Sequence, residues 1–301
     1  MVKESHILNF KTVCECNRYL KSKTWHPQVS LIHPDNSLLE ETSMKFEFYA
    51  ILLIKTDPSK FTGLGRTDYD YSHAAMLFLA PGEVFCLSQT ETLSSKSYLL
   101  VFHPELLERT SLQHHLNRYT FFGYRKEEAL HLSARETEKV MCCMENIDDE
   151  LHHPIDTHTA TLLSRHIELL LDYCTRYYER QFIIREDKHG KILEKAKKTI
   201  DNCILTGQLS KGLPLSADFI AEALGISTAY FTDLLRFETG HTPEVFFQLQ
   251  RMQAARRMLL CPEYTTAEIS HWLGYPSVQY FSLLFKRLTG IAPCEYCHTK
   301  N

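Results

Sequence analysis

Two short segments near the C-terminus carry side chains that can form hydrogen bonds with base edges and with phosphates. The first segment offers threonine hydroxyls, an aspartate and an arginine, and the second offers serine hydroxyls, a glutamine, a lysine and an arginine. Glutamine can pair with adenine, hydroxyls can contact bases or phosphates, and basic groups attract phosphates. The candidate contact residues are Thr228, Ala229, Thr232, Asp233 and Arg236 in the first segment and Ser277, Val278, Gln279, Ser282, Leu283, Lys286 and Arg287 in the second. These residue types predict two surfaces that read DNA. For the basic members, a solvated surface role is the alternative.

An internal repeat relates the two segments. Tyr230 and Tyr280 are 50 residues apart, and so are Gly240 and Gly290. A fixed offset of this kind indicates one structural unit that is used twice.

Each repeat predicts two short helices joined by a glycine turn. The first unit spans about residues 216–238 with its turn at Gly225, and the second spans about residues 265–288 with its turn at Gly274. This is the helix-turn-helix plan, whose second helix enters the major groove of DNA. The predicted helix caps are Ser216, Ser227, Thr265 and Ser277. The predicted inward residues are Phe219, Ile220, Ala223, Leu224, Tyr230, Phe231, Leu234, Leu235 and Phe237 in the first unit and Ile269, Trp272, Leu273, Tyr280, Phe281, Leu284, Phe285 and Leu288 in the second.

A longer helix is predicted between the two units. Thr242 and Pro243 suit its first turn. Its apolar stripe consists of Val245, Leu249, Met252, Ala255 and Leu259. A helix of about 17 residues is about 25 Å long, and successive major grooves on one face of DNA lie about 34 Å apart. Such a helix can hold two reading helices at a fixed separation.

A set of short motifs is distributed over about residues 190–301. They are the run from Ile220 to Ser227, Glu238-Thr239-Gly240, Arg251 with Ala255 and Leu259-Leu260, Leu273-Gly274-Tyr275, Tyr280-Phe281-Ser282, Phe285-Lys286-Arg287, and Thr289-Gly290 followed by Pro293 and Tyr296. In these motifs the chain resembles the AraC/XylS family of bacterial transcription regulators. The resemblance implies double-stranded promoter DNA and RNA polymerase as partners, a homodimer, and a cupin-like N-terminal β-barrel that responds to a small-molecule effector.

Two of the candidate contact residues depart from the pattern of that family. Many members have arginine at the positions of Asp233 and Leu283. An aspartate repels phosphate but can accept a hydrogen bond from cytosine N4, whereas a leucine offers only apolar contact, for instance to a thymine methyl group. The target sequence of the family therefore cannot be transferred to this chain.

The composition is that of an ordinary globular protein with 44% hydrophobic and 23% charged residues. The net charge is −4, but residues 190–301 hold 12 basic and 10 acidic residues, against 21 basic and 27 acidic in the remainder. Attraction of phosphate must then come from local placement and from helix N-termini.

The longest apolar runs are far shorter than the roughly 18 residues that cross a bilayer. With no signal-peptide core after Met1, the sequence predicts a cytoplasmic location and no membrane partner.

Residues 1–130 carry the signals of several short strands. The expected strands are Phe46–Ile54, Thr67–Tyr71, Ala74–Leu79, Glu83–Leu87 and Tyr98–Phe102. Their spacing is typical of a small β-barrel or sandwich. The predicted fold class is α+β and multidomain, with an N-terminal barrel that the resemblance implies is cupin-like, a helical connector and a helical C-terminal domain with two helix-turn-helix units.

Metal and cofactor chemistry is not expected in this N-terminal part. The His-x-His pair of metal-binding cupins does not occur among its histidines, so we expect no cofactor and no catalytic residue. A barrel without metal can still enclose a small ligand. Phe48, Tyr69, Tyr71 and Phe85 are candidates to line such a pocket, and plain core packing is the alternative that we favour for each.

Residues 131–189 predict a helical connector. Ser133 and Glu136 form a capping box for a helix with Val140, Met144, Ile147 and Leu151 on its inner face, and His152-His153-Pro154 ends it. A second helix from about Asp156 carries Leu163, Ile167, Leu170, Cys174 and Tyr177 on one stripe. The hairpin can mediate dimerisation or simply pack on the strands. The charged run Arg176–Lys188 predicts a solvated helix end and linker, and Gly190 opens the C-terminal domain, 190–301.

The ten cysteines include a misleading motif. Cys294-Glu295-Tyr296-Cys297-His298 matches the attachment sequence of c-type haem, but covalent haem attachment requires export. Reduced, partly buried thiols are the simplest interpretation of the ten, and thiol sensing is a minor alternative.

Three functional classes remain after these exclusions. The first is a ligand-responsive transcription regulator that binds promoter DNA. The second is a DNA-binding protein whose N-terminal domain serves only dimerisation. The third, which no motif in the sequence favours, is a cupin-type enzyme fused to a DNA-targeting domain.

Overall fold

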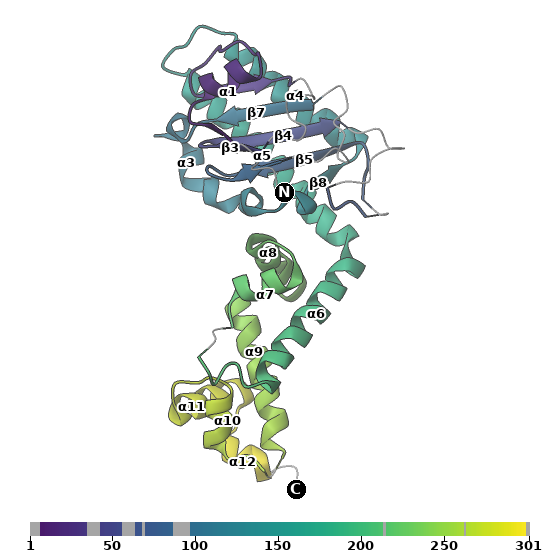
Figure 1. Ribbon diagram of the computed structural model, residues 1–301, viewed down its shortest axis with the longest axis vertical. Helices are drawn as coiled ribbons and strands as arrows, with labels where there is room; N and C mark the ends of the chain where they lie inside the picture. Colours follow the sequence, from purple (N-terminus) through teal and green to yellow (C-terminus); the bar gives the residue numbers. More distant parts are fainter. Residues whose placement is uncertain are drawn as a thin grey trace, which may run out of the picture. The chain divides into compact units, whose positions relative to one another are not determined.

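The computed structural model describes residues 7–34, 43–55, 64–67, 70–86, 97–212, 215–261 and 263–298. The chain divides into two compact units, Met1–Glu186 and Asp187–Asn301. The strands lie in the first unit, and the second unit is helical (Figure 1). None of the helices in the described ranges combines the length and apolar character that a bilayer-spanning segment needs.

Two sheets form the framework of the first unit. The larger sheet has the strand order β2-β7-β4-β5-β8, and every neighbouring pair in it is antiparallel. The smaller sheet has the order β1-β3-β6, in which β1 runs parallel to β3. The strands are β1 (Leu8–Phe10), β2 (Val29–Ile32), β3 (Met44–Phe46), β4 (Tyr49–Lys55), β5 (Ala74–Leu79), β6 (Val84–Phe85), β7 (Ser97–Phe102) and β8 (Leu130–Leu132).

One hydrophobic core lies between the two sheets. Alternate residues of β4, namely Ala50, Leu52 and Ile54, belong to this core together with Phe46 of the smaller sheet. Successive side chains of a strand point to opposite faces, so the intervening residues of β4 face away from this core. They are buried too, because helices cover that second face. Because β4 is buried on both faces, its sequence is continuously apolar.

The predicted barrel is not observed, because neither sheet closes on itself through the strand pairs of the described residues. The two facing sheets with a shared core correspond to the sandwich alternative. Within that core Phe48 and Phe85 are buried, as plain packing requires, whereas Tyr71 is exposed and lies against the guanidinium group of Arg180. Tyr69 lies outside the described residues.

Most of the predicted strands are present with shifted ends. The run Phe46–Ile54 is split into β3 and β4, and the predicted strand Thr67–Tyr71 is wrong for its described residues. There the backbone NH and the hydroxyl group of Thr67 both donate to the carboxylate of Asp70, at 2.7 and 2.9 Å, and so form a turn. Asp68 lies outside the described residues. In the first unit, the strands and α-helices that the sequence analysis did not identify are β1, β2, β8, the helix α1 (Val13–Tyr19) and the helix α3 (Ser111–His115).

Helices α4 (Ala134–Leu151) and α5 (Thr159–Ile184) pack together and on the larger sheet (Figure 1). The predicted inner stripes of both helices are buried throughout. Ser133 accepts from the backbone NH of Glu136 and forms the predicted capping box, and α4 ends directly before His152. The carboxylate of Asp156 accepts from the backbone NH groups of His158 and Thr159 and caps α5.

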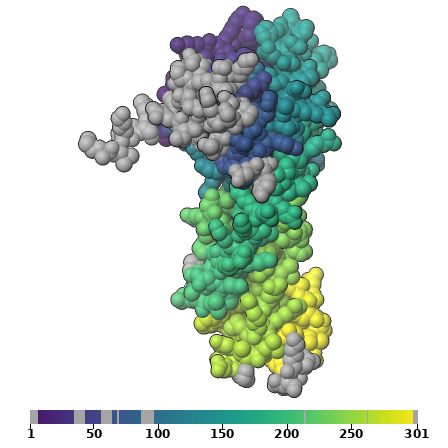
Figure 2. Space-filling model, turned by 90° about the vertical axis from the view of Figure 1, so that its right-hand side faces the viewer, coloured from purple at the N-terminus to yellow at the C-terminus, as the bar shows by residue number. Residues whose placement is uncertain are grey.

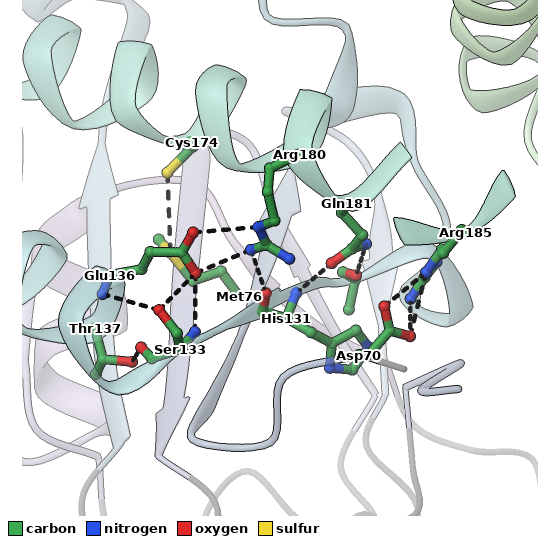
Figure 3. Close-up of polar contacts among 11 residues, drawn as sticks. Asp70, Met76, His131, Ser133, Glu136, Thr137, Cys174, Arg180, Gln181 and Arg185 are labelled. Carbon is green, nitrogen blue, oxygen red and sulfur yellow. Dashed lines mark hydrogen bonds and ion pairs between the residues drawn. The ribbon is translucent and has the colours of Figure 1, made fainter. Parts of the chain in front are cut away.

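Polar side chains of α5 hold it against the edge strand β8 (Figure 3). Gln181 donates to the carbonyl of Ala129 at 3.0 Å and accepts from the backbone NH of His131 at 2.8 Å. Arg180 donates to the carbonyl of His131 and pairs with Glu136 of α4. The open edge of a sheet exposes unpaired backbone groups, and these side chains occupy some of them.

A buried ion pair fixes the C-terminal end of α5. Arg185 donates to both carboxylate oxygens of Asp70 at 2.7 to 3.2 Å, and the two side chains are 1% and 0% exposed. Burial alone raises the pKa of Asp70, but hydrogen bonds and charge from Arg185 bring the pKa below its usual value. Burial and the nearby Arg185 lower the pKa of His131 to about 4. The prediction of a solvated helix end and linker at Arg176–Lys188 is therefore wrong for Arg185, because a carboxylate 115 residues away in sequence neutralises this arginine.

The second unit consists of helices arranged around α9 (Pro243–Leu259). They are α6 (Glu186–Leu205), α7 (Ala217–Leu224), α8 (Thr228–Thr239), α10 (Thr266–Trp272), α11 (Val278–Thr289) and α12 (Pro293–His298). Figure 1 shows α7 and α8 at one end of α9 and α10, α11 and α12 at the other. Gly190 lies inside α6, which is continuous from Glu186.

A single core joins both helix-turn-helix units to α9. It contains Ile220 and Phe231 of the first unit, Phe246 of α9, and Ile269 and Phe281 of the second unit. Several predicted inward residues are exposed instead, because such short helices bury only a narrow stripe. They are Phe219, Ala223, Phe237, Val245, Trp272, Tyr280 and Leu288.

The buried ion pair of the first unit predicts a large stability effect. Replacing Asp70 with Asn leaves the Arg185 charge buried against a neutral amide, which we expect to lower the free energy of unfolding by about 3 to 5 kcal/mol. Urea unfolding followed by the fluorescence of Trp25, with Trp272 replaced by Phe in all proteins, measures this change.

The matched control for this variant is Glu47→Gln. It breaks the half-exposed pair between Lys45 and Glu47, and surface pairs contribute little to stability, so we expect little change. Equal effects of the two substitutions would contradict the importance of the buried pair.

Candidate nucleic-acid interface

Helix α8 is positioned by a serine cap and a buried aromatic stripe. The hydroxyl oxygen of Ser227 accepts from the backbone NH of Tyr230 at 3.1 Å, and Gly240 ends the helix with φ of 71°. Tyr230, Phe231, Leu234 and Leu235 face the core. Gly225, also with φ of 71°, makes the turn between α7 and α8. The remaining face of α8 carries the five candidate contact residues of this helix.

Helix α11 repeats this construction. Ser277 accepts from the backbone NH of Tyr280 at 3.1 Å, and Gly290 ends the helix with φ of 85°. Phe281 and Phe285 are the buried anchors. At the preceding turn a Cβ atom on Gly274 would lie 2.9 Å from the carbonyl oxygen of Leu209, so this position requires glycine for its space as well as for its φ of 71°.

None of the twelve candidate contact residues is buried. The first reading surface is the set of candidate residues on α8: Thr228, Ala229, Thr232, Asp233 and Arg236. The second reading surface is the set on α11 and at its N-cap: Ser277, Val278, Gln279, Ser282, Leu283, Lys286 and Arg287. In the first, only Arg236 is fully exposed and the others are half-buried. In the second, Val278 and Ser282 are half-buried and the remaining five are exposed. The structure thus brings each set together on its own helix.

The first reading surface contains an acidic residue that the sequence analysis did not identify. Asp218 of α7 accepts a hydrogen bond of 2.7 Å from the hydroxyl group of Thr228. Together with Asp233 it gives this surface two carboxylates beside one arginine. Carboxylates repel phosphate and can accept from cytosine N4. The contact crosses the helix-turn-helix bend, so no helical spacing in the sequence could indicate it.

The second reading surface is basic and partly apolar. Lys286 and Arg287 are exposed in the last turns of α11, and Gln279 is exposed in its first turn. Leu283 is 73% exposed, an unusual degree for a leucine on a packed domain. This combination can pair with a base edge, attract phosphates and contact a thymine methyl group.

A buried histidine ties α8 to α6. His189 is completely buried, and its Nε2 atom lies 2.8 Å from the hydroxyl oxygen of Tyr230. Its Nδ1 atom lies 3.6 Å from a carboxylate oxygen of Glu238, which is also on α8. The equivalent tyrosine of the second unit, Tyr280, packs on Tyr275 and is 51% exposed. The sequence repeat does not predict this difference between Tyr230 and Tyr280, because α6 precedes only the first unit.

Helix α9 sets the distance between the two reading surfaces. It has 17 residues, as predicted from the sequence, and so is about 25 Å long. At its centre the guanidinium group of Arg251 lies 5.2 Å from the ring centre of Tyr275. Burial raises the pKa of Tyr275, and Arg251 opposes this shift. This contact anchors the second unit to α9.

Part of this chain is similar to known proteins. Residues 220–298 match a family model described as a helix-turn-helix domain. Over 82 residues the chain is 32% identical to the xylose operon regulatory protein of Escherichia coli strain K12, which covers 27% of this chain and 21% of that protein. The solved structure of the xylose-binding transcription activator xylR is 28% identical, covers 36% of this chain and 27% of that one, and gives a TM-score of 0.32. An AraC-type transcriptional regulator from Chromobacterium violaceum is 24% identical, with 36% and 91% coverage and a TM-score of 0.33.

Each of these similarities covers only part of this chain. The chain spans 21% of the length of the xylose operon regulatory protein that it matches. The family model falls on the stretch that contains both helix-turn-helix units and α9. Residues 220–298 are therefore an AraC-type helix-turn-helix domain, which confirms the resemblance of this chain to transcription regulators of the AraC/XylS family.

Proposed function

We propose that the protein is a sequence-specific DNA-binding transcription regulator whose two reading surfaces contact successive major grooves of promoter DNA. The observation that carries this proposal is the presence of two capped helix-turn-helix units on one rigid helix, with every candidate contact residue accessible. Bound at a promoter, such a protein would act through RNA polymerase. Activation and repression depend on where the site lies.

We expect the two reading surfaces to have different roles, because their charges differ. The second reading surface has two cations and an accessible glutamine, so we expect it to supply most of the phosphate attraction. The first reading surface has carboxylates that disfavour phosphate, so we expect it to select bases and to bind weakly by itself. The bound DNA site should therefore contain two half-elements about one helical turn apart.

Selection of genomic fragments by the purified full-length protein tests this proposal, at a stated salt concentration. Gln279→Ala should cost about 1 to 3 kcal/mol at a single base position and relax specificity there. Lys286→Ala should weaken binding to all sequences alike and reduce the dependence of log affinity on log salt by about one.

Gln253→Ala is the matched control for the glutamine variant. Gln253 is exposed on α9 and belongs to neither reading surface, so its loss should leave the binding profile unchanged. Binding without a recurrent motif, or equal effects of the two glutamine variants, would contradict the assignment of the second reading surface.

We also propose that helices α4 and α5 mediate a homodimer. Leu162 and Leu169 are 43% and 44% exposed on the outside of α5, and their spacing of seven residues places them on one face.

Light scattering after size exclusion should show a dimer for the natural chain. The double variant Leu162→Ser, Leu169→Ser should be monomeric at the same concentration, and Leu260→Ser, an equally exposed leucine of the second unit, should remain a dimer. A dimer that survives the double substitution would place the interface elsewhere.

Residues 1–130 are proposed as a cupin-like regulatory domain that binds a small-molecule effector. Two facing sheets around one core support the relationship to cupins. A specific effector present at 100 times its Kd should stabilise the protein by about 2.7 kcal/mol in thermal unfolding and change its DNA affinity. A chain that lacks residues 1–130 and regulates normally would contradict a regulatory role for this domain.

An enzyme fused to a DNA-targeting domain is the remaining class. The relatives that match the C-terminal domain are transcription regulators, which favours regulation over catalysis. Turnover by the purified protein of any compound that it binds would revive this alternative.

A further inference from the structure

A cavity of about 410 Å³ lies in the second unit, away from both reading surfaces. It is formed where the C-terminal ends of α6 and α9 meet α10, and Figure 2 shows the surfaces of α6 and α9 side by side in that unit. The lining residues are Asp201, Ile204, Leu205, Ala254, Arg257, Met258, Cys261, Tyr264 and Trp272. Ligand sites of proteins are typically cavities of about 300–1,000 Å³ with apolar walls and few polar groups.

Trp272, which is 38% exposed, is one of the lining residues. Its indole NH donates to the carbonyl oxygen of Ile204 at 2.7 Å, which ties α10 to the end of α6. Because that donor is already engaged, the indole presents its apolar ring to the cavity. The ring also lies within 3.5 Å of where a Cβ atom of Gly207 would be, so the wall is closely packed on its other side.

Large apolar side chains surround the opening. Leu205 is 76% exposed and Tyr264 is 44% exposed, although both line the cavity. Neither belongs to the core that joins the helix-turn-helix units to α9. These side chains therefore provide apolar surface that a bound molecule can cover.

The polar groups of the lining are arranged as one neutral pair. Arg257 donates to the carboxylate of Asp201 at 2.7 Å, and their side chains are 65% and 38% exposed. An ionic ligand would have to compete with the pairing that Arg257 and Asp201 already make with each other. A neutral group that carries a donor next to an acceptor can bond to both residues without separating them.

We propose that this cavity binds a small, flat, neutral aromatic molecule that carries an amide or lactam group. The aromatic part packs against Trp272, Met258 and Leu205, and the amide bonds to the pair of Asp201 and Arg257. The molecule would add contacts between α6, α9 and α10 and so stiffen the connection between the second helix-turn-helix unit and α9. This inference goes beyond the proposed function and does not depend on it, since binding is measured without DNA.

The experiment uses the full-length chain, in which Trp25 and Trp272 are the two tryptophans. In a Trp25→Phe protein labelled with ¹⁵N-tryptophan, the one indole NH signal in the NMR spectrum belongs to Trp272. Titration with 2-naphthamide, a neutral aromatic amide, should shift this signal saturably with one molecule bound per chain. Titration with 2-naphthoate and with 2-naphthylmethylammonium should give at least tenfold weaker binding.

Two variants assign the binding to the cavity. Leu205→Ser removes an exposed apolar wall and should weaken 2-naphthamide binding about tenfold, which corresponds to about 1.4 kcal/mol. Leu260→Ser removes a leucine that is 45% exposed but does not line the cavity, and it should leave binding unchanged. An unmoved Trp272 signal would overturn the site. Tighter binding of the carboxylate or the ammonium compound would overturn the ligand class, and equal effects of the two leucine variants would overturn the location.

Discussion

The continuous hydrophobic core along α9 is the constraint on which the DNA-binding part of this protein depends. Phe231 on one side and Phe281 and Phe285 on the other pack into the same core as Phe246 and Phe247 of α9. Because both units are packed on one helix, their separation is a property of that helix and its length. If α8 and α11 read DNA as proposed, they would address only sites whose half-elements have a matching spacing.

The two reading surfaces show that a structural repeat does not impose equal chemistry. Both recognition helices begin at a serine cap and end at a glycine with positive φ. Yet the first presents carboxylates and is held from behind by His189, whereas the second presents cations and an exposed leucine. The backbone plan depends on a few capping and core positions, so the outward positions are free to differ. Specificity is expected to arise from this difference.

The first unit reaches its stability partly through polar contacts with α5. Gln181 and Arg180 bond to backbone groups of β8, and Arg185 is neutralised by Asp70. Removing a charged group from water is costly, so such a pair persists only where its geometry is good. The pair fixes the last turn of α5 to the loop that contains Asp70.

The sequence alone determined the local features, because they depend on neighbours within a few residues. The capping boxes at Ser133 and Thr265, the glycine turns, the buried stripes of α4 and α5 and the length of α9 were all predictable from spacing. Tertiary structure decided the features that join distant parts of the chain. Arg185 pairs with Asp70 across 115 residues, and His189 contacts Tyr230 across 41. In the described part of the chain, the two sheets do not close into a barrel. No periodicity encodes such contacts, since a side chain's burial depends on which element covers it. For this reason Tyr230 is buried while its repeat partner Tyr280 is half exposed.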